Sequence, residues 1–117
     1  MTGPAFARAL DLVTRVRGVR GAMVVARADG LVVADLLMEG IKGSAVAALA
    51  ASLAGRLQRA MVGAGLGPSQ FWHLQCEQGA LLVVPAGDNL LVVAVTEPEV
   101  NVGLVRLELL RAAEVAT

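Results

Sequence analysis

Two neighbouring segments near the C-terminal end constrain the fold most, because both are apolar on every position. Leu81–Val84 reads Leu-Leu-Val-Val, and Leu90–Val95 reads Leu-Leu-Val-Val-Ala-Val. A strand with one wet face alternates apolar and polar residues, whereas a continuous apolar run predicts a strand that is buried on both faces. We therefore expect helices on both sides of the sheet that contains these strands.

The remaining segments predict the other elements of that sheet and the helices that cover it. The expected elements are a helix from Pro4 that Gly18 and Gly21 end, strands over Ala22–Arg27 and Leu31–Leu36, a central helix from Ser44 to Val62, strands over Gln70–Cys76, Ala80–Pro85 and Leu90–Thr96, and a final helix from Pro98 or Asn101. Ser44 is the expected N-cap of the central helix. The Asp29–Gly30 pair between two apolar runs is a strong hairpin signal. Short turns between successive strands make the sheet antiparallel.

The order helix-β-β-helix-β-β-β-helix predicts the fold class. We expect one domain over residues 1–117, of the α/β (α+β) class, with three α/β/α layers and a five-stranded antiparallel sheet. The hydrophobic residues make up 56% of the chain and the charged residues only 17%, against about 25% in an ordinary soluble domain. This is more apolar material than one domain of this size needs to bury, so the composition indicates a buried partner surface.

Charge and length argue against nucleic acid and membrane partners. Ten Lys and Arg balance ten Asp and Glu, so the chain lacks the basic surface of a nucleic-acid-binding protein. Gly43–Gly55 has 13 residues without Asp, Glu, Lys or Arg, and the longer uncharged stretch Ala60–Cys76, 17 residues, is interrupted by glycines and Pro68. A membrane-spanning helix needs about 20 apolar residues. The N-terminal residues resemble no signal peptide, and the single cysteine excludes an internal disulfide. We expect a cytoplasmic protein.

No residue pattern predicts catalysis. His73 and Cys76 are single residues of their kinds, and on one strand an odd spacing points them to opposite faces, so they cannot form a joint site. We interpret Cys76 as a core residue beside Trp72 and Leu74, and His73 as a surface or interface residue. The glycines of Gly63–Gly67 follow a helix, and Lys42 is the sole lysine, so no phosphate-binding loop is present. We expect no catalytic residue, no cofactor and no metal, and hence no enzyme.

The central helix carries the most informative surface. Its predicted sheet-facing stripe is Val46, Leu49, Leu53 and Leu57, and its opposite side carries the small residues Ala48, Ala51, Ser52 and Gly55. A solvent-facing surface is normally charged, so small neutral residues predict close contact with a second helix. The alternative is an alanine-rich helix that merely reflects the composition of the genome.

Two further features extend this predicted interface. The strand with Phe71, His73 and Gln75 is expected at a sheet edge, where its free backbone groups need a partner strand, and a two-fold contact would pair it with its own copy. Arg56 and Arg59 are the charges of the second half of the central helix. We expect them to bind a partner; the alternative is that they keep the helix end solvated.

The chain resembles the Roadblock / dynein light chain family, which includes the bacterial MglB group. The resemblance rests on the order of the elements and on three local patterns: Gly21–Ala34 around the first hairpin, Leu74–Gly79 with Asn89–Val92 after it, and Asn101–Val105 at the start of the last helix. It covers nearly the whole chain.

The resemblance implies a dimer of this chain with itself or with a related chain. In such a dimer the central helix and the third strand form the contact, giving a ten-stranded sheet. It also implies a non-catalytic protein that binds or regulates a small Ras-like GTPase on the paired helices. Two other functions stay open at this point, a structural adaptor that bridges proteins without a GTPase and a sensor domain that binds a small molecule.

Overall fold

The computed structural model describes residues 3–117, which form three helices and five strands. The elements are, in chain order, α1 (Gly3–Thr14), β1 (Val19–Ala26), β2 (Val32–Leu37), α2 (Gly43–Gly63), β3 (Trp72–Cys76), β4 (Gly79–Ala86), β5 (Leu90–Thr96) and α3 (Val102–Ala116). The strands form one antiparallel sheet with the order β2-β1-β5-β4-β3. The predicted fold class and element order are confirmed.

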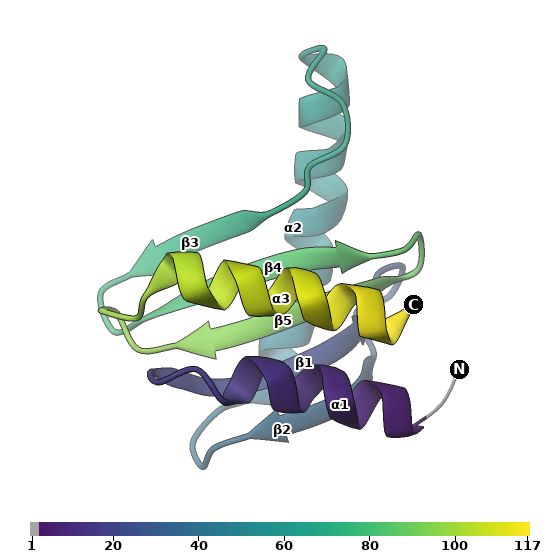
Figure 1. Ribbon diagram of the computed structural model, residues 1–117. Coiled ribbons are helices and arrows are strands. Elements are labelled where there is room, and N and C mark those ends of the chain that lie inside the picture. Colours follow the sequence, from purple (N-terminus) through teal and green to yellow (C-terminus); the bar gives the residue numbers. More distant parts are fainter. Residues whose placement is uncertain (1–2) are drawn as a thin grey trace.

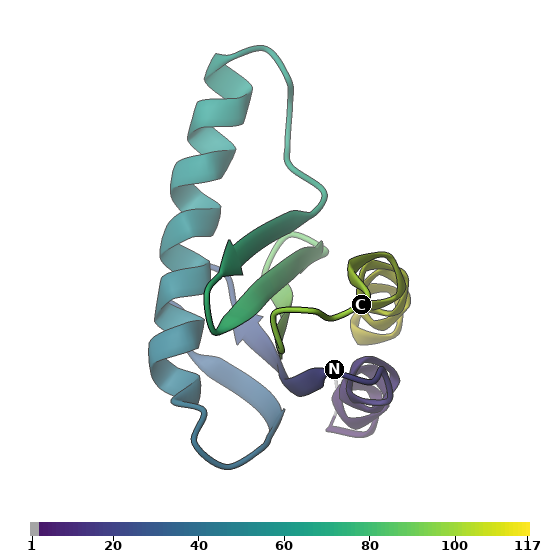
Figure 2. The same ribbon diagram turned by 90° about the vertical axis from the view of Figure 1, so that its left-hand side faces the viewer.

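The sheet separates two hydrophobic cores, as the two fully apolar strands predict, and helices cover both of its faces (Figures 1 and 2). Side chains that alternate along each strand enter one core or the other. Val24 and Val92 lie in the core beneath α1 and α3, and Met23 and Val93 lie in the core beneath α2, all fully buried. The helices α1 and α3 lie side by side and antiparallel on one face, while α2 alone lies on the other.

The boundaries of the first helix and strand differ from the prediction at one glycine. Gly18, with φ of +93°, follows α1, but Gly21 lies inside β1, which begins three residues before the expected Ala22. A Cβ on Gly21 would lie 2.7 Å from Leu37 Cδ2, so this glycine leaves room for a neighbouring side chain. Gly21 is therefore a packing position in the sheet and does not end the helix.

The ends of the other two helices show one correct and one wrong cap. The Asn101 side chain accepts a hydrogen bond from the Leu104 N–H at 3.0 Å, which makes Asn101 the N-cap of α3 and decides between the two expected starts. Ser44 is not a cap, because α2 begins at Gly43 and its N-cap residue Lys42 makes no side-chain hydrogen bond. At the other end Gly65, with φ of +81°, follows the last turn of α2, as its position in the sequence predicts.

The sheet-facing side of α2 is not the aliphatic stripe that the sequence predicts. The buried residues are Ala47, Ala50 and Ala54, whose small side chains bring the helix backbone close to the strands. Of the predicted stripe, Val46, Leu53 and Leu57 pack at the border of the core and Leu49 is 50% exposed. The helix is thus turned about its axis relative to the prediction, and an aliphatic side is left partly uncovered.

Candidate partner-binding surface

Helix α2 is longer than the sheet that it covers. It crosses the strands and continues past the β3 edge, so its C-terminal half stands beyond the domain (Figures 1 and 2). Arg56 and Arg59 lie on this half and are exposed, and neither takes part in an ion pair among residues 3–117. Exposed guanidinium groups without an internal partner are available to carboxylates of another protein.

Two sides of α2 flank the buried alanines and differ in chemistry. The first, here called the small flank, consists of Ala48, Ala51, Ser52 and Gly55. It is turned toward the β1–β2 turn: a Cβ on Gly30 would lie 3.2 Å from Ala48 Cα and 3.4 Å from Ala51 Cβ. Ala48 and Ser52 are exposed, whereas Ala51 and Gly55 are half-buried.

The second side, here called the aliphatic flank, consists of Val46, Leu49, Leu53 and Leu57. It borders a hollow of about 200 Å³ over the opposite end of the strands, with a lining that is almost entirely apolar. The hollow is lined by Val46, Leu49, Cys76, Gln78, Gly79, Ala80, Leu81 and Val95. This end of the sheet therefore has an apolar surface with no helix above it.

Cys76 lies in this hollow and is exposed, so its prediction as a core residue is wrong. The physical reason is the position of α2, which covers Trp72 at the start of β3 and leaves the end of that strand open. Leu74, between them on the same face, is 37% exposed. The predicted alternation along β3 is correct, but only its first apolar residue is buried.

The three predicted contact residues of β3 point to the other face of the sheet, where α3 lies. Phe71, just before the strand, packs against the core beneath α3, and the Arg106 guanidinium carbon lies 5.4 Å from its ring centroid. His73 Nε2 is 2.8 Å from Gln75 Oε1, and Gln75 Nε2 donates a hydrogen bond to the Pro98 carbonyl at 2.9 Å. His73 and Cys76 therefore lie on opposite faces, as their spacing predicts.

β3 is an edge strand and pairs only with β4 within the described chain. Its outer backbone groups are consequently available to another strand. The structure thus brings together an open strand edge, an uncovered apolar hollow and a helix that extends past both. The sequence analysis identified the strand edge and the helix but missed the hollow. The available signal is the spacing of Ala47, Ala50 and Ala54, which places these three residues on one side of α2 and allows that side to face the sheet.

The described residues contain neither a metal-binding cluster nor a membrane-spanning helix. No group of three or more His, Cys, Asp or Glu within residues 3–117 is arranged to hold a metal ion. In the same part of the chain no helix is both long and apolar enough to cross a membrane. The chemistry that the described surface offers is apolar contact, strand pairing and guanidinium binding.

Comparisons with known proteins agree on one family. The family model of the Roadblock/LC7 domain matches residues 6–96. The uncharacterized protein MJ1340 of Methanocaldococcus jannaschii is 36% identical over 107 residues, which cover 92% of each chain. A solved structure described as MglB with tetrameric arrangement superposes with a TM-score of 0.85 at 30% identity, covering 97% of this chain and 88% of the other. The gliding protein MglB of Thermus thermophilus gives a TM-score of 0.85 at 26% identity, with coverage of 98% and 89%.

Proposed function

Because the chain belongs to the Roadblock/LC7 family, we propose that it acts in the cytoplasm as a non-catalytic homodimer that binds and regulates a small Ras-like GTPase. The observation that carries this proposal is the extension of α2 past an open strand edge, next to an uncovered apolar hollow. A domain with these three features is incomplete alone and is completed by a second copy.

The proposed dimer pairs β3 with β3 of the second copy across a two-fold axis. Antiparallel pairing would satisfy the outer backbone groups of both strands and join the sheets into one of ten strands. The C-terminal half of each α2 would then lie over the sheet of the other copy, where the hollow is open. Both the strand edge and the hollow would be covered by the same contact.

This geometry favours the aliphatic flank as the seam between the two helices. The hollow lies on the side of Leu49, so a helix placed above it meets Leu49 and Leu53. The seam that the sequence predicts is the small flank, with Ala48, Ala51, Ser52 and Gly55, and it remains the alternative. The two seams lie on opposite sides of α2, so variants on each side distinguish them.

The proposed GTPase-binding surface is the outer side of the paired α2 helices. A two-fold dimer presents Arg56 and Arg59 twice, as four guanidinium groups near the seam. Such a ridge can bind carboxylates of a GTPase by charge-assisted hydrogen bonds. Regulation would then follow from affinity for one nucleotide state of the GTPase over the other.

The test is calorimetry of the dimer with a Ras-like GTPase of the same cell, loaded either with GDP or with a non-hydrolysable GTP analogue. We expect nucleotide-dependent binding that Arg56→Ala with Arg59→Ala weakens about tenfold, the loss of one to two charge-assisted hydrogen bonds. Lys42→Ala, which removes a charge at the other end of α2, is the matched control. Affinity that the double substitution leaves unchanged would exclude this docking surface.

The second candidate is a structural adaptor that bridges two proteins without a GTPase. The observation in its favour is that α1 and α3 form a separate exposed surface on the other side of the sheet from α2. An adaptor would bind its partners equally in the presence of GDP and of the GTP analogue. For either function we expect purified protein to hydrolyse no GTP by itself, as measured by phosphate release.

A further inference from the structure

The second edge of the sheet, at β2, is open and apolar. Among residues 3–117 β2 pairs with β1 alone, and it lies at the margin of the sheet farthest from β3 (Figure 1). An open edge can pair with another chain, so edge strands usually carry lysine, proline, a bulge or another charge that prevents it. Residues 31–38 contain no lysine and no proline. A bulge is present at Val33, but Ala34–Leu37 continues in regular register with β1.

The hydrogen bonds of this regular part show which backbone groups are free. The Met38 N–H donates to the Arg20 carbonyl at 2.9 Å, so the backbone of Met38 faces β1. Residues of an antiparallel strand face their neighbour alternately, and Leu36 therefore also faces β1. Asp35 and Leu37 consequently point their N–H and C=O groups outward, where the described chain provides no further strand. These groups can bind another strand through main-chain hydrogen bonds.

The side chains of β2 differ between the two faces of the sheet. Leu36 lies opposite Ala22, on the face that α1 and α3 cover, and Met38 shares this face by alternation. Leu36 and Met38 are 51% and 60% exposed. Asp35 lies opposite Met23, on the face of α2, and is exposed. A strand beside β2 would thus meet apolar side chains on one face and a carboxylate on the other.

The charges along this edge are carboxylates. Residues 28–41 contain Asp29, Asp35 and Glu39 and no lysine or arginine. All three carboxylates are exposed, and none takes part in an ion pair among residues 3–117. Arg20 and Lys42 lie near the Glu39 end of the stretch, whereas Asp35 has only apolar neighbours on β1 and β2. The middle of the edge therefore favours a basic side chain in a partner.

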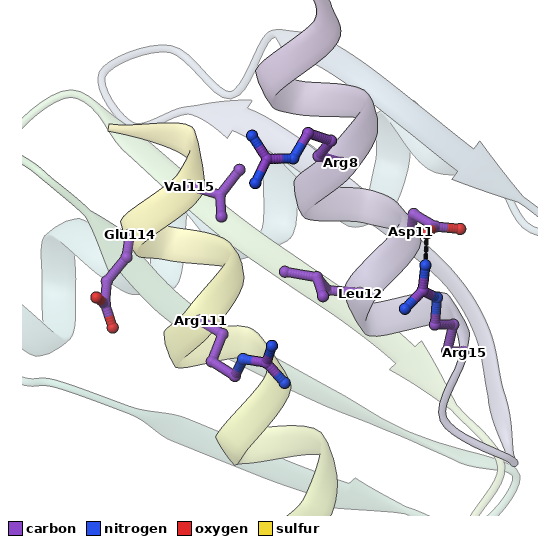
Figure 3. A pocket seen from close by; sticks show the side chains of 7 residues that line it. All are labelled: Arg8, Asp11, Leu12, Arg15, Arg111, Glu114 and Val115. Atoms are coloured by element: carbon purple, nitrogen blue, oxygen red, sulfur yellow. Dashed lines mark hydrogen bonds and ion pairs between the residues drawn. The ribbon is translucent and has the colours of Figure 1, made fainter.

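The hollow between α1 and α3 differs from this edge in its charges. It measures about 290 Å³, and the charged residues that line it are Arg8, Asp11, Arg15, Arg111 and Glu114. Figure 3 shows the ion pair of Asp11 with Arg15 among them. Because both signs are present, the hollow selects neither an acidic nor a basic partner, whereas the edge of β2 carries one sign only.

We propose that β2 binds an extended segment of a partner protein in which apolar residues alternate with lysine or arginine. The backbone of this segment would pair with Asp35 and Leu37 and add a strand to the sheet. Its apolar side chains would cover Leu36 and Met38, and a basic side chain on the other face would pair with Asp35 across the two strands. Main-chain hydrogen bonds would supply affinity, and the alternation of the side chains would supply specificity.

The carboxylates argue for this segment over a second copy of β2. Depending on the register, a two-fold contact between the outward groups places Asp35 opposite Asp35, Leu37 or Glu39 of the second copy. Each register leaves the Asp35 carboxylate beside a like charge or an apolar side chain, and neither stabilises it. The proposed dimer uses β3, at the opposite margin of the sheet, so this proposal stands or falls independently of the proposed function.

The test uses the full chain and a labelled β-hairpin peptide whose outer strand, about six residues long, alternates valine and lysine. A counterpart with glutamate in place of lysine is the control. Fluorescence anisotropy should show about tenfold tighter binding of the lysine peptide, because the cross-strand pair at Asp35 changes from repulsive to attractive. Amide hydrogen exchange should slow at Asp35 and Leu37, whose N–H groups point outward, and not in β3.

Substitutions at Asp35 separate the charge from the backbone contact. Asp35→Asn removes the charge alone and should weaken the lysine peptide about threefold. Asp35→Pro also removes the outward N–H, which an edge strand tolerates, and should abolish detectable binding. Asp35→Lys should invert the preference, so that the glutamate peptide binds more tightly. Asp88→Lys makes the same change of charge in the β4–β5 turn and should leave both affinities unchanged, and circular dichroism checks that each variant is folded.

Three results would overturn the proposal directly: equal affinity for the two peptides, an unchanged preference with Asp35→Lys, or slowed exchange in β3 in place of β2. Sedimentation velocity without peptide examines the other occupant. If it shows an assembly larger than the dimer that Leu36→Lys disrupts, a second copy occupies β2 and the proposal is wrong.

Discussion

The two faces of the sheet are equally apolar, yet they are covered very differently. Two helices, α1 and α3, lie side by side on one face, and the core beneath them includes the fully buried Val13, Val105 and Leu109. On the other face α2 alone packs through three alanines and leaves Leu49 and Leu74 partly exposed. Apolar strands therefore do not guarantee a complete cover: the helices complete the first face, whereas part of the second face is left open for a partner.

The largest effect should follow from a cavity in the finished face. Leu109→Ala should lower the free energy of unfolding by about 2–5 kcal/mol, because Leu109 is fully buried and its neighbours cannot all relax into the space. Leu107→Ala, two positions earlier and 52% exposed, should change it by no more than about 0.5 kcal/mol. Urea denaturation at one protein concentration measures both.

If both substitutions lower the free energy of unfolding by the same amount, the proposed difference between the two faces of the sheet is wrong. A large loss with Leu107→Ala would mean that α3 is covered in the free protein, so that the face of α1 and α3 would be incomplete as well. A small loss with Leu109→Ala would mean that this core is loosely packed.

The next effect concerns the open face and distinguishes the two sides of α2. Leu49→Glu should raise the dissociation constant of the dimer about 100-fold, because a carboxylate in an apolar seam costs roughly 3 kcal/mol. Gly55→Glu introduces the same group on the small flank, about a third of a turn around the helix from Leu49, where a Cβ would meet only Arg59 Nη1 at 3.4 Å, and should have little effect. Sedimentation velocity over a range of concentrations measures both constants.

The reverse result, a monomer with Gly55→Glu and an intact dimer with Leu49→Glu, would place the seam on the small flank that the sequence predicts. If both variants remain dimeric, the dimer contact lies outside α2. Circular dichroism of each variant separates a lost contact from a lost fold.

Most of the fold could be predicted because its signals are local. The fully apolar Leu81–Val84 and Leu90–Val95 indicate a sheet covered on both sides, and the Asp29–Gly30 turn indicates the first hairpin. The odd spacing of His73 and Cys76 correctly assigns them to opposite faces. Each of these conclusions needs only the period of a strand or the geometry of a turn.

The parts that could not be predicted depend on where α2 lies on the sheet. The sequence shows two candidate stripes on this helix, one aliphatic and one of small residues, and the larger side chains are the ordinary choice for a core. The structure packs Ala47, Ala50 and Ala54 against the strands, which displaces Leu49 outward. The prediction that Cys76 is buried is wrong for the same reason. The alternation of residues within β3 does not indicate how much of that strand a helix from elsewhere in the chain covers.

The smallest effect should come from a single methyl group on the small flank, at Gly55. Glycine inside a helix is less stable than alanine by about 1 kcal/mol, and a Cβ at Gly55 would meet only Arg59 Nη1, at 3.4 Å. Gly55→Ala should therefore raise the free energy of unfolding by about 0.5–1 kcal/mol and leave the dissociation constant of the dimer unchanged. If Gly55 instead allows a second helix to approach closely, the added methyl group would weaken the dimer while each monomer gains stability. Thermal denaturation of the dilute protein together with sedimentation at higher concentration separates the two effects, so this conservative change examines the small flank without introducing a charge.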